Sequence, residues 1–569
     1  MWWKNATVYQ IYPASFQDSN GDGIGDIPGI HSQLDYIQSL GVDAIWLCPM
    51  YDSPQHDMGY DISNYEAVYP PYGTVEDVEK LIEACHARGL RILLDLVVNH
   101  TSDEHAWFQE SRSSISSAKR DWYIWRPPRY DPDGKRHPPN NWRSCFGGSA
   151  WAWDDTTGEY YLHLFAPQQP DLNWENEETR KAIYASAMEF WLCKGIDGFR
   201  IDVVNAYSKD TSFPDAPVTD PRLEWQYASH LFCNGPRIHE YLREMSTILK
   251  KYNAMTVGEL PLTPEIEQVL SYVSAKEEKL SMVFQFDIVD LGTGEALRYH
   301  TVPRNWTLPE LKERVCATQR LMDGTTDGWS TAFLENHDQA RCVSRWGCEN
   351  TPELWSQSAK MLAILVASLS GTLFVYQGQE IGMVNVPASW GMVEYKDLES
   401  QNYYEHVRRT SHDDPVALAA AKTALQHLAR DHARIPMQWD STPHAGFTTP
   451  DATPWMRAHD NYANLNVKRQ ALDGQSVLSF WKRVLAIRKE YPDVFAQGVF
   501  AHTDPEDEKL FIFEKKGDGR KLVVVLNFTP TEQENNLEAK LGRQFELLLS
   551  NAGENTHRLQ PYEGRMYLV

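Results

Sequence analysis

The feature that most limits how this 569-residue chain can fold is a regular alternation of short apolar runs and helical segments. Segments with apolar residues at helical spacing, such as residues 75–88 and 177–193, separate the runs. Strands that alternate with helices form a parallel sheet, and eight such units close a (β/α)8 TIM barrel. The predicted class is therefore α/β. The eight predicted strands are residues 7–12, 44–48, 91–97, 198–203, 255–260, 282–286, 331–334 and 372–376.

Two interruptions of the alternation predict additional structure around the barrel. Residues 101–170 contain no barrel strand and are rich in Trp, Pro, Asn and Asp, which indicates a small subdomain inserted after the third strand. A second insertion, at about 384–432, follows the eighth strand. The barrel itself is thus expected over residues 1–100 and 171–495.

Near the end of the chain, the spacing of the apolar residues changes to the period of two that is typical of β-strands. Runs at 510–513, 522–526 and 545–549 alternate with period two and are separated by turn sequences such as Lys516-Gly517-Asp518-Gly519. This pattern predicts that residues 496–569 form a C-terminal antiparallel β domain, expected to be a β-sandwich.

Charge and composition exclude several classes of partner. The net charge of −24 argues against binding to nucleic acid or to an anionic membrane. No apolar run is long enough to span a membrane, and no leader precedes the first strand, so a cytoplasmic protein is expected. The eight cysteines lack metal-type spacing and are expected to be reduced thiols. The expected partner is a small neutral or cationic ligand. The oligomeric state stays open, and a monomer fits the sequence.

Polar residues stand where four of the predicted strands end. Arg200 and Asp202 are two positions apart, so they project from the same side of one strand. A guanidinium beside a carboxylate favours the ionised acid, as a carboxylate nucleophile requires. Each residue alone could belong to a buried ion pair or a capped loop, but four strand ends at one rim indicate a shared active site. The other residues at these ends are Asp95, Asn99, His100, Glu259, His337 and Asp338.

These stretches resemble the α-amylase superfamily (glycoside hydrolase family 13), and within it the isomaltase, oligo-1,6-glucosidase and maltase group. Matching motifs follow the family's order along nearly the whole chain. The five general motifs are residues 95–100, 169–173, 198–203, 258–260 and 333–338, and the subgroup motifs are 11–13, 57–61, 163–165 and 434–440.

The resemblance implies a retaining, exo-acting α-glucosidase that releases glucose from short α-glucosides. It implies that Asp202 is the nucleophile, Glu259 the general acid/base and Asp338 the stabiliser of the transition state. Retention predicts that the carboxyl groups of Asp202 and Glu259 lie about 5–5.5 Å apart. The residues that the resemblance places at the sugar are Asp57, Tyr60, His100, Phe165, Arg200, Val203, His337 and Arg434.

Several of these roles have consequences or alternatives. A charge pair of Asp57 with Arg434 would close the far end of the glucose pocket and so enforce exo-action. For Tyr60 and Phe165, core packing is the alternative to sugar stacking. In the subgroup, Val at the position after the nucleophile accompanies preference for α-1,6 linkages, so Val203 predicts isomaltose-type substrates.

Other functions remain open at this point. An α-1,4-glucosidase (maltase) and a sucrose-isomerising or transglycosylating enzyme share the same first half-reaction. A non-catalytic, transporter-associated barrel domain is a remote alternative, because such domains have a membrane helix ahead of the barrel and have lost part of the carboxylate set.

A loop after the first strand carries oxygen ligands at alternating positions, like the first half of an EF-hand loop, but lacks that motif's closing Glu. The alternative is a polar, glycine-rich loop. The resemblance implies one structural Ca²⁺ here, and no organic cofactor is expected. The implied ligands are Asp18, Asn20, Asp22, the Ile24 carbonyl and Asp26.

Overall fold

The computed structural model describes residues 1–294, 303–535, 546–553 and 557–569. The eight predicted strands form one parallel sheet in the order β13-β12-β11-β5-β2-β1-β15-β14. A parallel bridge between Val283 and Ser330 joins the two outer strands, so the sheet closes into the predicted TIM barrel. The strands are β1 (Thr7–Ile11), β2 (Ala44–Leu47), β5 (Arg91–Leu96), β11 (Gly198–Ile201), β12 (Met255–Glu259), β13 (Met282–Phe284), β14 (Thr331–Ala332) and β15 (Thr372–Tyr376).

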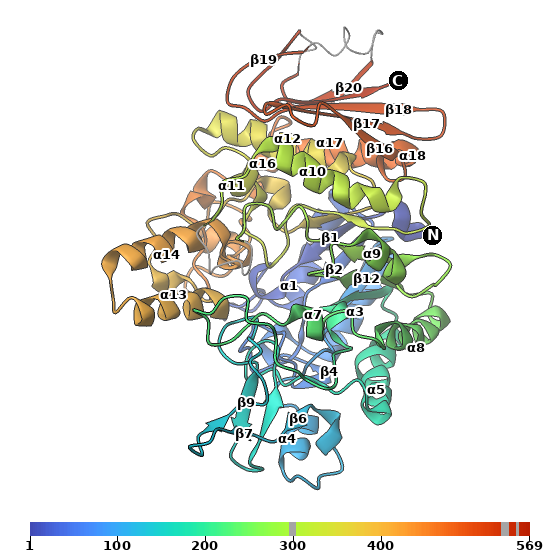
Figure 1. Ribbon diagram of the computed structural model, residues 1–569. Helices are drawn as coiled ribbons and strands as arrows, with labels where there is room; N and C mark the ends of the chain where they lie inside the picture. Colours follow the sequence, from blue (N-terminus) through green and yellow to red (C-terminus); the bar gives the residue numbers. More distant parts are fainter. Residues whose placement is uncertain (295–302, 536–545, 554–556) are drawn as a thin grey trace.

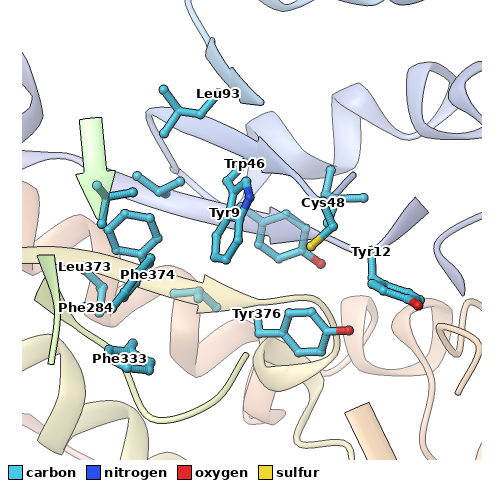
Figure 2. Close-up of a cluster of buried hydrophobic side chains, with 14 of the residues drawn as sticks. Tyr9, Tyr12, Trp46, Cys48, Leu93, Phe284, Phe333, Leu373, Phe374 and Tyr376 are labelled. Carbon is cyan, nitrogen blue, oxygen red and sulfur yellow. The ribbon is translucent and has the colours of Figure 1, made fainter. Parts of the chain in front are cut away.

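Large side chains fill the inside of the barrel, so it is a packed core and not a channel (Figure 2). The ring of Phe284 lies 4.7 Å from that of Phe374, 5.0 Å from that of Phe333 and 5.6 Å from that of Trp46, measured between centroids. These residues come from four different strands or strand ends, as barrel geometry requires.

Helices surround the barrel (Figure 1). Helix α3 (Val75–Ala87) begins with a capping box, in which Thr74 accepts from the Asp77 N–H and Asp77 reaches back to the N–H of Thr74. The segment 177–193 is not one continuous α-helix, because a π-helical turn (Tyr184–Glu189) separates α5 (Glu177–Ile183) from α6 (Phe190–Leu192). The other helices of the barrel layer are α1 (Ile27–Ser32), α2 (Leu34–Ser39), α8 (Ile238–Lys251), α9 (Ile266–Val273), α10 (Leu308–Gln319), α12 (Pro352–Ser368) and α17 (Val477–Glu490).

Between β5 and β11 the chain leaves the barrel and forms small antiparallel sheets. The order β6-β10-β9 makes the larger one, from β6 (Trp125–Arg126), β9 (Trp151–Asp154) and β10 (Glu159–Leu162). Strands β7 (Arg129–Tyr130) and β8 (Arg136–His137) pair beside it, and α4 (Ala106–Arg112) precedes them.

Between β2 and β5, a short antiparallel pair of β3 (Tyr51–Asp52) with β4 (Asn64–Val68) flanks a loop that carries Asp57 and Tyr60.

After β15 the second insertion forms the helix pair α13 (Leu398–Thr410) and α14 (Pro415–Leu428), followed by α15 (Asp431–Arg434). Short helices elsewhere are α7 (Ser229–Phe232), α11 (Cys342–Trp346), α16 (Val467–Ala471) and α18 (Pro492–Phe495). None of the helices in the described part of the chain is both long and apolar enough to cross a membrane.

The predicted C-terminal antiparallel β domain is confirmed. Its main sheet has the order β16-β17-β18-β22-β20, and a two-stranded sheet pairs β19 (Gln533–Glu534) with β21 (Arg558–Leu559). Phe545, the first residue of the predicted run 545–549, lies outside the described residues. All eight cysteines are free thiols, and five of them are buried. The main strands are β16 (Val499–Thr503), β17 (Leu510–Lys516), β18 (Lys521–Asn527), β20 (Glu546–Ser550) and β22 (Gly564–Leu568).

Candidate active site

Acids from three neighbouring barrel strands meet at the guanidinium of Arg200. Its Nη1 atom donates to Asp202 Oδ1 at 2.6 Å and to Asp95 Oδ1 at 2.9 Å. Its Nη2 atom lies 2.8 Å from Glu259 Oε2. Arg200 is in β11, Asp202 follows that strand directly, and Asp95 and Glu259 come from the strands on either side. The fold therefore brings these predicted strand-end residues together.

The electrostatics of this cluster are set by three buried acids around one cation. Burial raises the pKa of Asp202 well above its usual value; Arg200 opposes this, while Glu259 and Asp95 add to it. Burial also raises the pKa of Asp95 to about 6, against the influence of Arg200. Since one guanidinium cannot balance three carboxylates, a proton is favoured within the cluster near neutral pH. The site can thus hold one protonated and one ionised acid side by side.

His337 sits in a buried polar and aromatic network next to this cluster. Its Nε2 atom is 2.6 Å from Tyr60 Oη and its Nδ1 atom is 2.9 Å from Gln10 Nε2. Burial lowers the pKa of His337 well below its ordinary value, so the ring is neutral. With the Gln10 amide oriented this way, Nδ1 accepts and Nε2 donates to Tyr60, which in turn donates to Asp95 Oδ2 at 3.1 Å. Tyr60 also stacks on His337, with ring centroids 5.2 Å apart.

Arg430 and Arg434, here called the arginine pair, bind a second group of acids, Asp338 and Asp57. Arg434 Nη2 lies 2.6 Å from Asp338 Oδ1, and Arg430 Nη1 lies 3.2 Å from the same oxygen. Arg430 Nη2 lies 3.1 Å from Asp57 Oδ1. Burial raises the pKa of Asp57 to about 6, although both arginines act to lower it.

The structure corrects the expected pairing of Asp57 with Arg434. Among the described contacts Asp57 pairs with Arg430, while Arg434 pairs with Asp338 and with Asp397, which lies 2.7 Å from its Nη1 atom. The physical reason is that Asp397, behind the pair, holds the Arg434 guanidinium against Asp338. Arg430, four residues earlier, then reaches Asp57.

His100 and Phe165 complete the wall around Asp57. Gln169 Nε2 donates to Asp57 Oδ2 at 3.0 Å and lies 3.2 Å from His100 Nε2. Burial lowers the pKa of His100 to about 4, so this ring is neutral too. The rings of His100 and Phe165 are 5.1 Å apart between centroids. The structure therefore gathers the predicted sugar-contacting residues in one place.

A cavity of about 300 Å³ opens beside Glu259 and Val203. Val203 has a left-handed backbone (φ 34°, ψ 49°), which is rare for a β-branched residue, and its N–H donates to Glu259 Oε2 at 3.2 Å. The lining is largely apolar, and the charged residues in its described part are all acidic. The lining includes Phe146, Phe165, Phe232, Phe286, Leu262, Glu259, Asp290 and Glu399.

Comparison with known proteins decides the family, because the sequence model described as "Alpha amylase, catalytic domain" matches residues 10–498. The chain belongs to the alpha-amylase family. An alpha-glucosidase of Candida albicans is 51% identical to it over 573 residues, covering 100% of this chain and 99% of that protein. An oligo-1,6-glucosidase of Saccharomyces cerevisiae is 47% identical, with coverages of 100% and 98%.

Solved structures agree with this assignment to the alpha-amylase family. A trehalulose synthase variant in complex with Tris superposes with a TM-score of 0.92 at 38% identity, covering 100% of both chains. A variant of the trehalose-6-phosphate hydrolase of Bacillus licheniformis superposes with a TM-score of 0.90 at 40% identity, covering 100% of this chain and 99% of that one.

The loop expected to bind Ca²⁺ places its oxygen atoms in a series of tight turns. Asp18 Oδ1 accepts from the N–H groups of Asn20 and Gly21, and Asp22 Oδ1 accepts from that of Ile24. Asp26 is buried, which raises its pKa, and the nearby Asp18 adds to this. Within the described residues, no Lys, Arg or His forms an ion pair with the three acids of this loop.

The loop can be compared with a Ca²⁺ site in the type of its ligands and in their arrangement. Hard carboxylate, amide and carbonyl oxygens without a cationic partner suit Ca²⁺ chemically. The carboxylates are not gathered in advance, however: in the part of the chain that the structure describes, no three His, Cys, Asp or Glu side chains are arranged to hold a metal ion. The loop thus has the oxygen ligands that Ca²⁺ prefers, but they are only partly arranged around one point.

Sequence reasoning missed three residues of the site, Gln169, Arg430 and Asp397, and it placed Asp95 at a strand end without giving it a role. Gln169 stands inside a quoted motif. Arg430 precedes Arg434 by four residues, a spacing that places two side chains on one helix face and could have identified it. Asp397 had no signal beyond being a capping residue ahead of a helical pattern, so only the structure reveals it.

Proposed function

We propose that this chain is a retaining, exo-acting α-glucosidase that releases glucose from the non-reducing end of short α-glucosides, with preference for α-1,6 linkages. The observation on which this rests is the binding of Asp202 and Glu259 by the two Nη atoms of Arg200, together with the binding of Asp338 by the arginine pair. The relatives named alpha-glucosidase and oligo-1,6-glucosidase support it.

The proposed first step breaks the glycosidic bond. Glu259 gives its proton to the departing oxygen while Asp202 attacks the anomeric carbon, forming a covalent glucosyl-enzyme through an oxocarbenium-like state. Asp338, held by the arginine pair, would stabilise the developing positive charge with its negative charge. Binding of Asp202 and Glu259 to one guanidinium supports the short carboxyl separation that retention requires, about 5–5.5 Å.

The proposed second step restores the enzyme. Glu259, now ionised, takes a proton from a water molecule, which attacks the anomeric carbon and releases Asp202. The proton favoured within the acid cluster is then again available for the next cycle. Arg200 stays cationic throughout, because the surrounding acids raise its pKa well above its usual value in spite of burial.

Exo-action follows from the closed far wall. Arg430 with Asp57, Gln169 and His100 forms a continuous hydrogen-bonded barrier, in which Asp57 and His100 are buried. A chain of sugars could not extend past it, so one glucose unit would occupy the pocket at a time. Rapid loss of viscosity from soluble starch would be incompatible with this arrangement.

Linkage preference is tested by comparing kcat/KM for isomaltose, maltose, sucrose and an aryl α-glucoside. We expect isomaltose to exceed maltose, because the branched side chain of Val203 lines the cavity where the second sugar would lie. Val203→Thr should raise kcat/KM for maltose relative to isomaltose. Faster turnover of maltose by the unaltered enzyme would instead assign an α-1,4-glucosidase.

Two alternatives differ at the same cavity. A sucrose isomerase would return a rearranged disaccharide, so product analysis at high sucrose concentration separates it from a hydrolase. Among the described residues, the charged side chains that line the cavity are Glu259, Asp290 and Glu399, which would repel a phosphate and so disfavour action on trehalose 6-phosphate.

We also propose that the loop containing Asp18, Asn20, Asp22, Ile24 and Asp26 holds one structural Ca²⁺. Three acids without an ion-pair partner among the described residues support a cation there. When bound, the ion would neutralise these carboxylates and tie the loop together, and it would take no part in the bond-breaking steps.

A further inference from the structure

Asp397 lies behind the arginine pair and contacts both guanidinium groups. Its Oδ2 atom is 2.7 Å from Arg434 Nη1 and 2.8 Å from Arg430 Nη2. Its Oδ1 atom accepts a hydrogen bond from Arg430 Nε at 3.1 Å. The side chain is fully buried and does not line the cavity beside Glu259. Asp397 therefore contacts both arginines from a buried position outside that cavity.

The arginine pair needs such a counter-charge. Burial and the charge of Arg430 both act to lower the pKa of Arg434, but Asp397 and Asp338 are among the groups that outweigh them. Burial alone would raise the pKa of Asp397, yet the two arginines lower it, so this carboxylate is ionised. Without its charge, two buried guanidinium groups would repel one another and compete for Asp338 and Asp57.

Asp397 is itself firmly held. It is the N-cap residue of α13 and accepts the N–H of Glu399 at 3.0 Å. Its own N–H donates to Asp431 Oδ1 at 2.9 Å. Asp397 and Arg430 both belong to the insertion that follows β15, so this inserted segment, and not the barrel alone, determines the geometry of the far wall.

We propose that Asp397 is a positioning residue, which fixes the arginine pair so that Arg430 holds Asp57 and both arginines hold Asp338. This inference rests on the proposed α-glucosidase function and deepens it. Asp397 acts through the arginines and makes no contact with substrate. It therefore influences both the binding of the terminal glucose, through Asp57, and the stabilisation of the transition state, through Asp338.

The test is Asp397→Asn, which keeps the shape of the side chain and removes its charge. If the amide oxygen keeps the place of Oδ2, the amide NH2 group faces two donors, Arg430 Nε and the Glu399 N–H, so the arginine pair should shift. We expect kcat/KM for an aryl α-glucoside to fall on the order of 100-fold, as for other displacements of about 1 Å. Both KM and the inhibition constant of a glucose-like competitive inhibitor should rise. Asp397→Glu restores the charge and should recover part of the loss.

A matched control separates positioning from folding. Asp414→Ala removes the N-cap of α14 in the same insertion, where Asp414 is exposed and accepts from backbone N–H groups. A variant that merely folds poorly lowers the active fraction, and so the apparent kcat, but leaves KM and the inhibition constant unchanged; this is the expectation for Asp414→Ala.

The same measurements keep the two proposals apart. If the unaltered enzyme does not hydrolyse the aryl α-glucoside, the proposed function fails. If it does, and Asp397→Asn keeps the parent KM and inhibition constant, then the positioning role of Asp397 is refuted while the α-glucosidase function stands.

Discussion

Glu335 illustrates how a single buried acid can influence stability without serving the active site. It precedes Asp338 by three residues, but its Oε2 accepts from the Cys342 N–H at 3.1 Å and lies 3.9 Å from Arg341 Nη1. Burial raises the pKa of Glu335 from 4.5 to about 7, with Arg341 acting in the opposite direction. The folded protein therefore binds this proton more tightly than the unfolded chain does.

The sign of the pH effect follows from that difference. Glu335 makes its full contribution to stability below about pH 4.5, and the contribution is lost as the pH rises through 7. Gln at this position does not titrate. We therefore expect the free energy of unfolding of Glu335→Gln, relative to the parent, to increase by about 3 kcal/mol between pH 4.5 and 8. Urea denaturation of both proteins across this range measures it, and parallel pH curves would contradict it.

At the scale of elements, the loop that follows β1 is expected to depend on metal. The purified protein should contain about one Ca²⁺ per chain, and Asp22→Ala should contain less. Chelation should lower the melting temperature of the parent but not of the variant, since a ligand at about 100 times its Kd stabilises a fold by about 2.7 kcal/mol. Activity below the melting temperature should be unchanged by chelation.

The control for this metal prediction is Glu66→Ala, which removes an exposed carboxylate outside the loop and should keep both metal content and chelator response. If chelation changes neither the metal content nor the melting temperature of the parent, the loop holds no Ca²⁺ and its turns are maintained by the Asp18 and Asp22 hydrogen bonds alone.

Some secondary-structure elements could be predicted from the sequence and others could not. The eight barrel strands were predictable because each is a short, almost fully buried run between helical segments, as in β15 with its buried Thr372–Tyr376. The π-helical turn at Tyr184–Glu189 was not, because apolar spacing does not distinguish it from an α-helix. The pairing of Asp57 with Arg430 could not be predicted either, because it depends on how the insertion after β15 folds back over the barrel.

For the whole molecule, the barrel and the C-terminal β domain share one hydrophobic core. Phe511, Phe513, Val524 and Met566 of the β domain belong to the same buried cluster as the barrel strands. Helix α12 packs against β18 and β22, between the barrel and the β domain (Figure 1). We infer that the two parts stabilise each other across this junction.

Two buried basic side chains lie at that junction. Arg488 donates to the carbonyl oxygens of Ala367 and Leu369 at the C-terminal end of α12, at 2.6 and 2.9 Å. Lys515, in β17, donates from Nζ to the carbonyl oxygen of Phe495. Burial lowers the pKa of Lys515 well below its usual value, and the charge of Arg488 lowers it further. Within the described residues neither of these two side chains forms an ion pair with a carboxylate.

Lys515→Met should therefore stabilise the whole molecule. Met has a similar length and introduces no charge, so at pH 7 the free energy of unfolding should rise by about 1–3 kcal/mol. Because the folded-state pKa of Lys515 is depressed, the parent gains stability as the pH rises toward 10.5, and the advantage of the variant should shrink. Chemical denaturation at pH 7 and pH 10 measures this.

The control is Lys516→Met, at an exposed neighbouring position, whose free energy of unfolding should stay within about 0.5 kcal/mol of that of the parent. A Lys515→Met protein that is less stable at pH 7 would mean that the bond to Phe495 outweighs the cost of burying the charge.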